Sequence, residues 1–338
     1  MVAPLLDVRN LTTVFRTAAG EFAAVDDVSF ALAPGEVFGI VGESGSGKSV
    51  TALSIMGLLP DPPGRIRSGS IRFEGRELVG MPARERRSLR GSAIGMVFQE
   101  PMTSLNPVFT IGDQITETIQ AHEAVGKAAA LSRATDLLAR VGIPSPRRKL
   151  DDYPHQLSGG MRQRVMIAMA LACSPRLLLA DEPTTALDVT IQAQLLDLLR
   201  DLQRETGMAV VIITHNMGVI AEFADRVMVM YAGRVAEEGP VTAIFDEPRH
   251  PYTIGLIAST PSLVRDEPTL RTIPGHLPRL GPQPPGCRFE PRCVRRIDAC
   301  RLGQPETRVA GPLHTVACLR WDQPAAGEAL PDLFGTAP

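Results

Sequence analysis

Two patterns of apolar and polar residues follow one another along the chain. Residues 5–32 alternate apolar and polar side chains in short runs, and Ser70–Phe73, before a Glu-Gly pair, repeats the alternation. A period of two is typical of strands with one solvated face. We therefore predict antiparallel strands in both places.

Four later runs are almost wholly apolar, and each is followed at once by a polar element. Strands of this kind are expected in a parallel sheet that is buried on both faces. Ligands of such sheets bind beyond the carboxyl ends of the strands. The pattern predicts an α/β fold with a mostly parallel sheet and one binding crevice. The runs are 37–41 before a Gly-rich loop, 94–98 before Gln99, 177–180 before Asp181-Glu182, and 210–214 before His215.

Helical spacing over about 112–142 predicts a helical subdomain, at about 100–165, and a further helix is expected from Ile191 to Glu205. The composition changes near residue 248, because 15 of the 29 prolines lie in the last 91 residues. This composition favours a loop-rich extension, which must be held together by something other than a large apolar core. We expect a main domain over 5–247, an extension over 248–325 and a flexible tail over 326–338.

The composition narrows the class of protein. The chain is 44% hydrophobic and 21% charged, with a formal net charge of −2. Without a basic excess, nucleic acid is not expected as the main partner. The N-terminus lacks the basic and apolar regions of a signal peptide, and no apolar run approaches the roughly 18–20 residues of a membrane span. We expect a cytosolic protein, or one held at a membrane face by other proteins.

The Gly-rich loop matches GxxxxGK[ST], the pattern of loops that cradle nucleotide phosphates. Backbone N–H groups and the start of the next helix face the phosphates, Lys48 neutralises the β/γ oxygens, and Ser49 reaches Mg²⁺. This predicts a bound nucleoside triphosphate with Mg²⁺. The expected nucleotide contacts are Gly42, Glu43, Ser44, Gly45, Ser46, Gly47, Lys48, Ser49 and Val50.

Polar residues at the other strand ends complete this chemistry. Asp181 is placed to hold Mg²⁺, directly or through water, and Glu182 to act as general base on the attacking water. Alone, an Asp-Glu pair after a strand would be read as a helix N-cap. Gln99 can sense the γ-phosphate, Mg²⁺ or the lytic water. His215 ends another strand, where a histidine taken singly is more often structural.

A second anion site is predicted at Ser158, Gly159 and Gly160, at the start of a helix. The free N–H groups and the positive dipole end of a helix attract anions. One nucleotide already has its phosphates bound by the first loop. The second site therefore makes most sense if it serves a nucleotide held by another subunit, although a simply capped helix is the alternative.

These motifs, GESGSGKS, LSGGMRQR and the Asp-Glu pair after a strand, together resemble the ATP-binding subunit of an ABC transporter. The resemblance implies that His215 contacts the γ-phosphate and that Gln99 belongs to the Q-loop, whose flanking sequence resembles that of peptide importers. It also implies that Asp188 lies in the D-loop of the dimer interface and that Phe15 stacks on adenine.

Beyond residue 248, the run His250-Pro251-Tyr252-Thr253 and the Cys-rich tail resemble the C-terminal extension of oligopeptide/dipeptide/nickel importer ATPases. The resemblance implies a peripheral ATPase that pairs with a similar or identical ATPase subunit. Two transmembrane permease subunits and an extracytoplasmic solute-binding protein would complete the transporter. The alternative is a soluble ABC ATPase acting on nucleic acid or ribosomes, but such proteins usually carry two ATPase units or a long coiled coil.

Four of the five cysteines lie in one C-terminal segment. In a reducing compartment such a group indicates metal ligands before disulfides. Their gaps of 5, 6 and 17 residues do not give the C-x₂₋₄-C pairs of structural zinc sites. Similar tails of peptide-importer ATPases are associated with [4Fe–4S] clusters, which implies such a cluster here, with zinc or unliganded thiols as alternatives. The expected ligands are Cys287, Cys293, Cys300 and Cys318.

Overall fold

The structure is a computed structural model in which the chain divides into two units. The first unit is built mainly from residues 33–36 and 80–212, and the second from residues 4–32, 37–79 and 213 onward. The expected flexible tail at 326–338 lies outside the described residues. The described residues are 3–18, 20–100, 104–185, 187–260, 272–278, 281 and 283–323.

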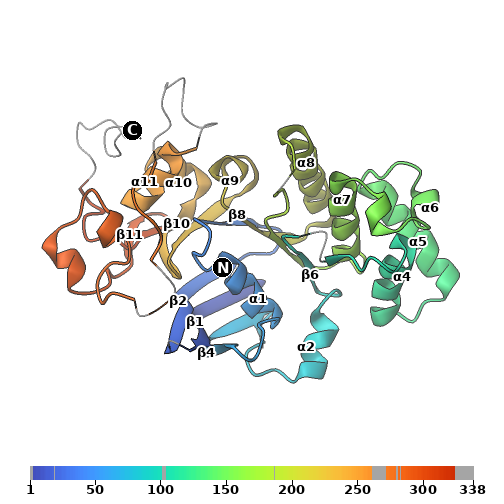
Figure 1. Cartoon of the computed structure of the whole chain (residues 1–338), viewed down its shortest axis with the longest axis horizontal. Helices are drawn as coiled ribbons and strands as arrows, with labels where there is room; N and C mark the ends of the chain where they lie inside the picture. Colours follow the sequence, from blue (N-terminus) through green and yellow to red (C-terminus); the bar gives the residue numbers. More distant parts are fainter. Residues whose placement is uncertain are drawn as a thin grey trace. The chain divides into compact units, whose positions relative to one another are not determined.

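The first sheet of the second unit confirms the predicted antiparallel strands. β1 pairs antiparallel with β2 on one side and with β4 on the other, so that Leu6 stands opposite both Leu32 and Phe73. The order of strands is β2-β1-β4-β5. Helix α1 packs against β1 and β2 (Figure 1). The elements are β1 (Leu6–Thr17), β2 (Gly20–Leu32), β4 (Gly64–Phe73), β5 (Arg76–Glu77) and α1 (Lys48–Met56).

The other strands of the second unit join parallel and antiparallel pairs in the order β11-β12-β10-β9-β3. β3 is buried at every position and runs parallel to β9, as the apolar run predicted. Helix α9 packs on β3, α10 on β9 and β10, and α11 on β10. The elements are β3 (Val37–Val41), α9 (Met217–Phe223), β9 (Arg226–Tyr231), β10 (Arg234–Pro240), α10 (Val241–Asp246), α11 (Pro251–Ala258), η2 (Glu290–Arg292), η3 (Asp298–Arg301), β11 (Arg308–Gly311) and β12 (His314–Val316).

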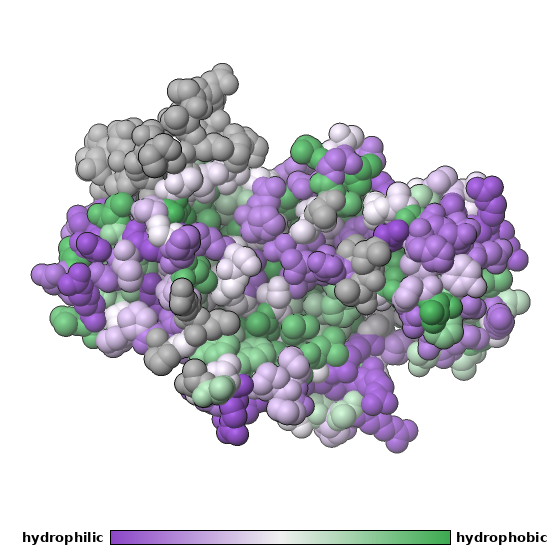
Figure 2. All heavy atoms as spheres, viewed as in Figure 1, coloured by the Kyte–Doolittle hydropathy of each residue, from purple (hydrophilic) through white to green (hydrophobic). Residues whose placement is uncertain are grey.

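The first unit combines two parallel strands with the predicted helical subdomain. β6 and β7 pair in parallel, with Gly95 opposite Leu178. Helices α4, α5, α6 and α7 form one group that presents mostly hydrophilic residues in the view of Figure 2 (Figures 1 and 2). The elements are α2 (Ala83–Leu89), β6 (Ile94–Val97), α4 (Ile111–His122), α5 (Lys127–Arg140), α6 (Pro146–Lys149), η1 (Pro154–Gln156), α7 (Gly159–Ala170), β7 (Leu177–Asp181) and α8 (Val189–Thr206).

Helix α8 shows how local sequence sets the bounds of an element. Asp188 caps its start by accepting a hydrogen bond from the Ile191 N–H (2.9 Å), and Gly207 ends it in the left-handed conformation (φ 68°). Its buried side chains Leu195, Leu199 and Leu202 recur at helical spacing. β8 (Ala209–Thr214) then carries the chain from the first unit into the second. Among the described helices, none is long and apolar enough to cross a membrane.

A fully buried carboxylate joins helix α11 and strand β12 to strand β10 within the second unit. Glu237 of β10 accepts hydrogen bonds from the backbone N–H groups of Arg249 (2.7 Å) and His250 (2.9 Å). It also contacts Nε2 of His314 in β12 at 2.8 Å. A buried carboxylate needs such partners, because an unpaired one would carry a large desolvation cost. Glu237 therefore fixes both the start of α11 and strand β12, which pairs with β10.

Replacing Glu237 is expected to loosen this junction. In Glu237→Ala two buried N–H groups and the His314 ring lose their partner, which should lower the free energy of local opening at β12 by about 3 kcal/mol. Hydrogen exchange of the β12 amides measures this. Glu247→Ala is the matched control, because its exposed pair with Arg249 should contribute within about 0.5 kcal/mol. Equal protection of β12 in both variants would contradict the role of Glu237.

Candidate functional site

The Gly-rich loop lies in the second unit, between the buried strand β3 and helix α1. Its path leaves no room for side chains at two glycines. A Cβ atom on Gly42 would lie 2.2 Å from the Met230 carbonyl oxygen, and one on Gly47 would lie 2.5 Å from that of Ala24. Both glycines also have positive φ angles, 155° and 103°. The close approach of backbone to backbone thus explains why glycines stand at both positions.

Lys48 is 4% exposed and lies at the first position of α1. Its Nζ donates to the carbonyl oxygens of Gly42 (2.8 Å) and Glu43 (3.0 Å), which curls the loop around the ammonium group. The residue before this helix is Gly47, which has no side chain with which to cap the helix start. A buried cation and a helix N-terminus in one loop make a site for phosphate.

The structure brings Gln99 and Glu182 together in the first unit. Gln99 follows β6 and its Nε2 donates to Oε2 of Glu182 at 3.3 Å, while the Thr185 hydroxyl donates to the same oxygen at 2.7 Å. Asp181, at the end of β7, is 5% exposed and Glu182 is 9% exposed. Glu182 has φ 47°, a left-handed conformation that is uncommon for a glutamate and that is found enriched at functional sites.

Two helix starts of the first unit lie side by side on the surface. Ser158 is exposed and caps α7 by accepting from the Met161 N–H at 3.3 Å, and Asp188 caps α8. A Cβ atom on Gly160 would lie 3.1 Å from Cγ2 of Ile191, so the two first turns touch. The predicted anion site and the predicted D-loop residue are therefore neighbours.

The remaining predicted residues, Phe15 and His215, belong to the second unit with the Gly-rich loop. His215 directly follows β8 and is exposed. Phe15 is half-buried and stacks on Phe22, with ring centroids 5.9 Å apart. Gln99, Asp181, Glu182, Asp188 and the anion site at Ser158–Gly160 belong to the first unit.

All four C-terminal cysteines line one small cavity in the second unit. No disulfide joins them. Within the described part of the chain, no three or more Cys, His, Asp or Glu side chains converge closely enough to hold one metal ion. The four thiols thus share one cavity. The four are Cys287, Cys293, Cys300 and Cys318.

Burial makes these thiols poor acids. It raises the pKa of Cys287 to about 11 and that of Cys293 to about 12, and the neighbouring cysteines add to both shifts. Burial likewise raises the pKa of Cys318. Four thiolates in this cavity would therefore need positive charge, which a bound metal supplies.

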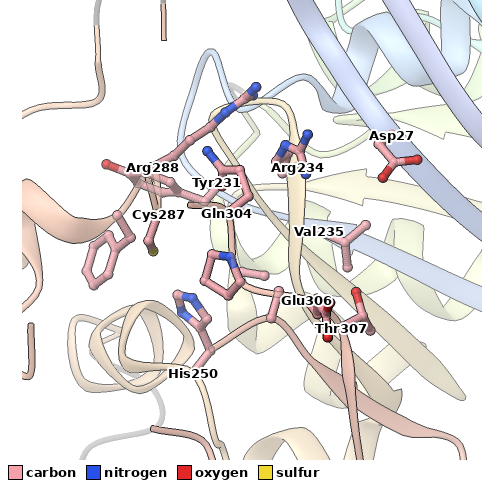
Figure 3. A pocket seen from close by; sticks show the side chains of 14 residues that line it. Asp27, Tyr231, Arg234, Val235, His250, Cys287, Arg288, Gln304, Glu306 and Thr307 are labelled. Carbon is pink, nitrogen blue, oxygen red and sulfur yellow. The ribbon is translucent and has the colours of Figure 1, made fainter. Parts of the chain in front are cut away.

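A larger pocket of about 260 Å³ adjoins this cavity and shares Cys287 and His250 with it. Figure 3 shows Arg234 and Arg288 on one side of it and Glu306 on the other. Both arginines pair with the one carboxylate of Asp26, and two further carboxylates, those of Asp27 and Glu306, line the pocket itself. The pocket is consequently a mixed polar cavity without an excess of positive charge.

Sequence reasoning missed the residues that connect the C-terminal segment to the Gly-rich loop. These are Tyr252 and Arg292, both of which contact Glu43. Tyr252 lies in the quoted run 250–253, so a signal of its importance was present. No local signal in the sequence links Arg292 to Glu43, because the two residues are 249 positions apart.

Comparison with known families agrees with this arrangement. The ABC transporter family matches residues 25–185, and the family described as oligopeptide/dipeptide transporter, C-terminal region, matches residues 236–300. The chain is 54% identical to a putative peptide import ATP-binding protein of Brucella melitensis biotype 1, over 96% of this chain and 99% of that protein. It is 52% identical to another protein so described, from Brucella abortus, over 91% of this chain and 93% of that protein.

Solved structures show the same fold. The dimeric structure of an ATP-binding cassette in a post-hydrolysis state, bound to ADP and Pi, superposes with a TM-score of 0.63 at 29% identity. The match covers 70% of this chain and 98% of the other. The chain thus combines a phosphate loop, carboxylates at strand ends and a helical subdomain with full-length similarity to putative peptide import ATP-binding proteins. It belongs to the ABC transporter family of ATPases, with an oligopeptide/dipeptide-transporter C-terminal region.

Proposed function

We propose that this protein hydrolyses ATP to power the import of peptides, or of a related small solute, through an ABC transporter. The observation that carries the proposal is the full-length similarity to putative peptide import ATP-binding proteins, joined to a Glu182 side chain held at a strand end by Gln99 and Thr185. In this proposal residues 5–247 form the ATPase domain and residues 248–325 the extension.

Nucleotide binding is assigned to the loop of the second unit. The N–H groups of residues 42–50 would bind phosphate oxygens, and Lys48 would exchange the loop carbonyls for the β/γ oxygens. Phe15 would stack on adenine. Mg²⁺ would be held by Ser49, Gln99 and Asp181 and would neutralise charge on the phosphates.

Hydrolysis is assigned to residues at the other strand ends. Glu182 would accept the proton of the attacking water at a carboxylate oxygen, while its hydrogen bonds from Gln99 and Thr185 keep the carboxylate from rotating. His215 would donate to the γ-phosphate. Because proton acceptance needs a particular orientation, the strained backbone of Glu182 is consistent with a positioning role.

Each active site is proposed to be shared between two ATPase subunits. Ser158, Gly159 and Gly160 lie at an exposed or half-exposed helix start of the first unit, whereas the Gly-rich loop belongs to the second unit. A phosphate presented by a second, identical or homologous subunit would meet this helix start, with Asp188 beside it.

The proposal places the protein at the cytoplasmic face of a membrane, under two permease subunits supplied by an extracytoplasmic solute-binding protein. In the first unit, Val108 is 71% exposed and Phe109 is 50% exposed just before α4. Large apolar side chains exposed side by side are typical of a surface that a protein partner covers. We assign these two residues to contact with a permease.

The four cysteines are proposed to hold a [4Fe–4S] cluster, with zinc as the alternative. The proposal is supported by the four thiols lining one cavity, because cysteine thiolates are the usual ligands of such clusters. The metal would also supply folding free energy to a segment with a small apolar core.

Glu182→Gln should abolish turnover while nucleotide still binds. The amide keeps the shape of the side chain but cannot accept a proton, so hydrolysis should fall at least about 100-fold with ATP affinity nearly unchanged. Lys48→Ala should instead weaken nucleotide binding itself. Glu205→Gln, an exposed glutamate paired with Arg140, is the control and should behave as the native protein. Undiminished hydrolysis in Glu182→Gln would remove this residue from the base role.

Mixed dimers of two tagged copies test whether sites are shared. One pairing carries Lys48→Ala in one copy and Ser158→Arg in the other, so that a shared arrangement places both lesions in one site and leaves the other intact. The control pairing carries both changes in one copy beside a native copy, which damages both shared sites. ATPase rates should be higher in the first pairing. The reverse order would show that each subunit works alone.

Purification without oxygen tests the cluster. We expect about four iron atoms and four acid-labile sulfides per chain, with visible absorbance, and their loss in Cys293→Ser. Cys173→Ser is the control, because Cys173 lies in the first unit, apart from the cavity. A colourless protein with one zinc and no sulfide would refute the cluster. A metal-free protein with an ordered C-terminal segment would refute both metals.

A further inference from the structure

Arg292 joins the C-terminal segment directly to the Gly-rich phosphate loop. It ends η2, one residue before Cys293, and its side chain is only 5% exposed. Its guanidinium makes two hydrogen bonds to Glu43, from Nη1 to Oε2 (2.6 Å) and from Nη2 to Oε1 (2.9 Å). Both residues belong to the second unit. Paired bonds of this kind fix orientation as well as distance.

The other donors of Arg292 hold a second stretch of chain beside the loop. Nε donates to the carbonyl oxygen of Pro274 at 2.9 Å, and the guanidinium lies over the ring of Tyr231, 5.8 Å from its centroid. A Cβ atom on Gly45 of the loop would lie 3.6 Å from the Leu277 side chain. Residues 272–278 therefore pass along the loop and are held there by the same arginine. A lysine, with a single point charge, could not reproduce this fork of contacts.

Tyr252 holds the backbone of the same loop residue. Its hydroxyl oxygen accepts a hydrogen bond from the Glu43 N–H at 2.8 Å. The ring is fully buried in an aromatic cluster with Tyr231 and Phe289, whose centroids lie 4.7 and 5.4 Å away. Burial also lowers the pKa of His250 to about 4, so its neutral Nδ1 accepts from the Tyr252 N–H and fixes the start of α11.

The contacts of Arg292 and Tyr252 with Glu43 also affect the position of the Lys48 side chain. The carbonyl oxygens of Gly42 and Glu43 are the groups on which its ammonium rests. Holding the side chain and the N–H of Glu43 thus also holds the part of the loop that orients Lys48. A loop already in its binding shape loses less conformational entropy when the nucleotide binds.

We propose that Arg292 is a positioning residue through which the C-terminal segment keeps the phosphate loop in its nucleotide-binding shape. The inference rests on the proposed nucleotide site at Gly42–Ser49 and is independent of which metal the cysteines hold. Disorder in the segment around Cys293 would reach the loop through Glu43 and lower the affinity for ATP. The C-terminal extension thereby contributes to ATP affinity through the phosphate loop.

The test measures the affinity of the purified full-length chain for a non-hydrolysable ATP analogue with Mg²⁺, together with KM and kcat for ATP. Arg292→Gln should weaken binding and raise KM roughly tenfold, with kcat within about twofold, because the hydrolytic residues are untouched. Arg292→Lys should recover only part of the loss. Arg301→Gln is the matched control: its exposed pair with Glu290 lies in the same segment, and native affinity is expected.

A double-mutant cycle with Glu43→Gln separates the proposed link from general damage. If Arg292 acts through Glu43, the double variant should be no weaker than the worse single variant. Tyr252→Phe, which removes one oxygen atom from a buried ring, should weaken binding about threefold without unfolding the segment. Glu43 is 31% exposed at its side chain, so water can solvate it when Arg292 is replaced.

Unchanged affinity in both Arg292→Gln and Tyr252→Phe would overturn the proposal. So would losses that simply add in the Arg292–Glu43 cycle. Failure of the nucleotide site itself has a different signature, because the native chain and Lys48→Ala would then bind the analogue equally. The two hypotheses are thus distinguished by the same set of titrations.

Discussion

The close approach of backbone segments around the phosphate loop constrains the rest of the second unit. Gly42 lies against the Met230 carbonyl of β9 and Gly47 against the Ala24 carbonyl of β2, at distances that exclude any Cβ atom. The Gly233 N–H also donates to the Ser46 carbonyl at 2.8 Å. One loop is therefore in contact with strands of both sheets. A side chain at either glycine would have to displace backbone, which a close-packed interior resists.

The C-terminal segment depends on charged links more than on a large apolar core. Arg288 pairs with Asp26, Arg292 with Glu43, and His314 contacts Glu237. In each case a group of the C-terminal segment meets a carboxylate that lies before residue 240. Buried pairs of this kind add little net stability, since desolvation offsets attraction, but breaking one is costly. They specify where a Pro-rich segment lies, and a bound metal would add the stability that they lack.

The first unit concentrates its chemistry at element ends. Ser158 and Asp188 begin neighbouring helices, and Glu182 follows the buried strand β7. Helix starts expose N–H groups that suit phosphate, and strand ends carry side chains out of the core. The left-handed backbone at Glu182 is the local cost of directing a carboxylate toward Gln99 and Thr185.

The sequence alone determined the elements and the local motifs. The alternating run 5–32 and the apolar runs before Gln99, Asp181 and His215 became the expected strands, because burial on one or two faces imposes these periods directly. Similarly, GxxxxGKS specifies its own turn and helix start. The clustering of the four cysteines in one C-terminal segment already favoured a common site, and the structure places them in one cavity, whereas their irregular spacing did not identify a ligand.

The tertiary structure decided which distant residues meet. Nothing local to Arg292 points to Glu43, 249 residues away, and nothing local to Glu237 points to His314. Such pairs arise because the C-terminal segment packs back against β10 and the Gly-rich loop, and the path of that segment depends on the packing of whole elements. Hydrophobic periodicity encodes which face of an element is buried, but not which element covers it, and this is why the link between the extension and the phosphate loop could be seen only in the folded chain.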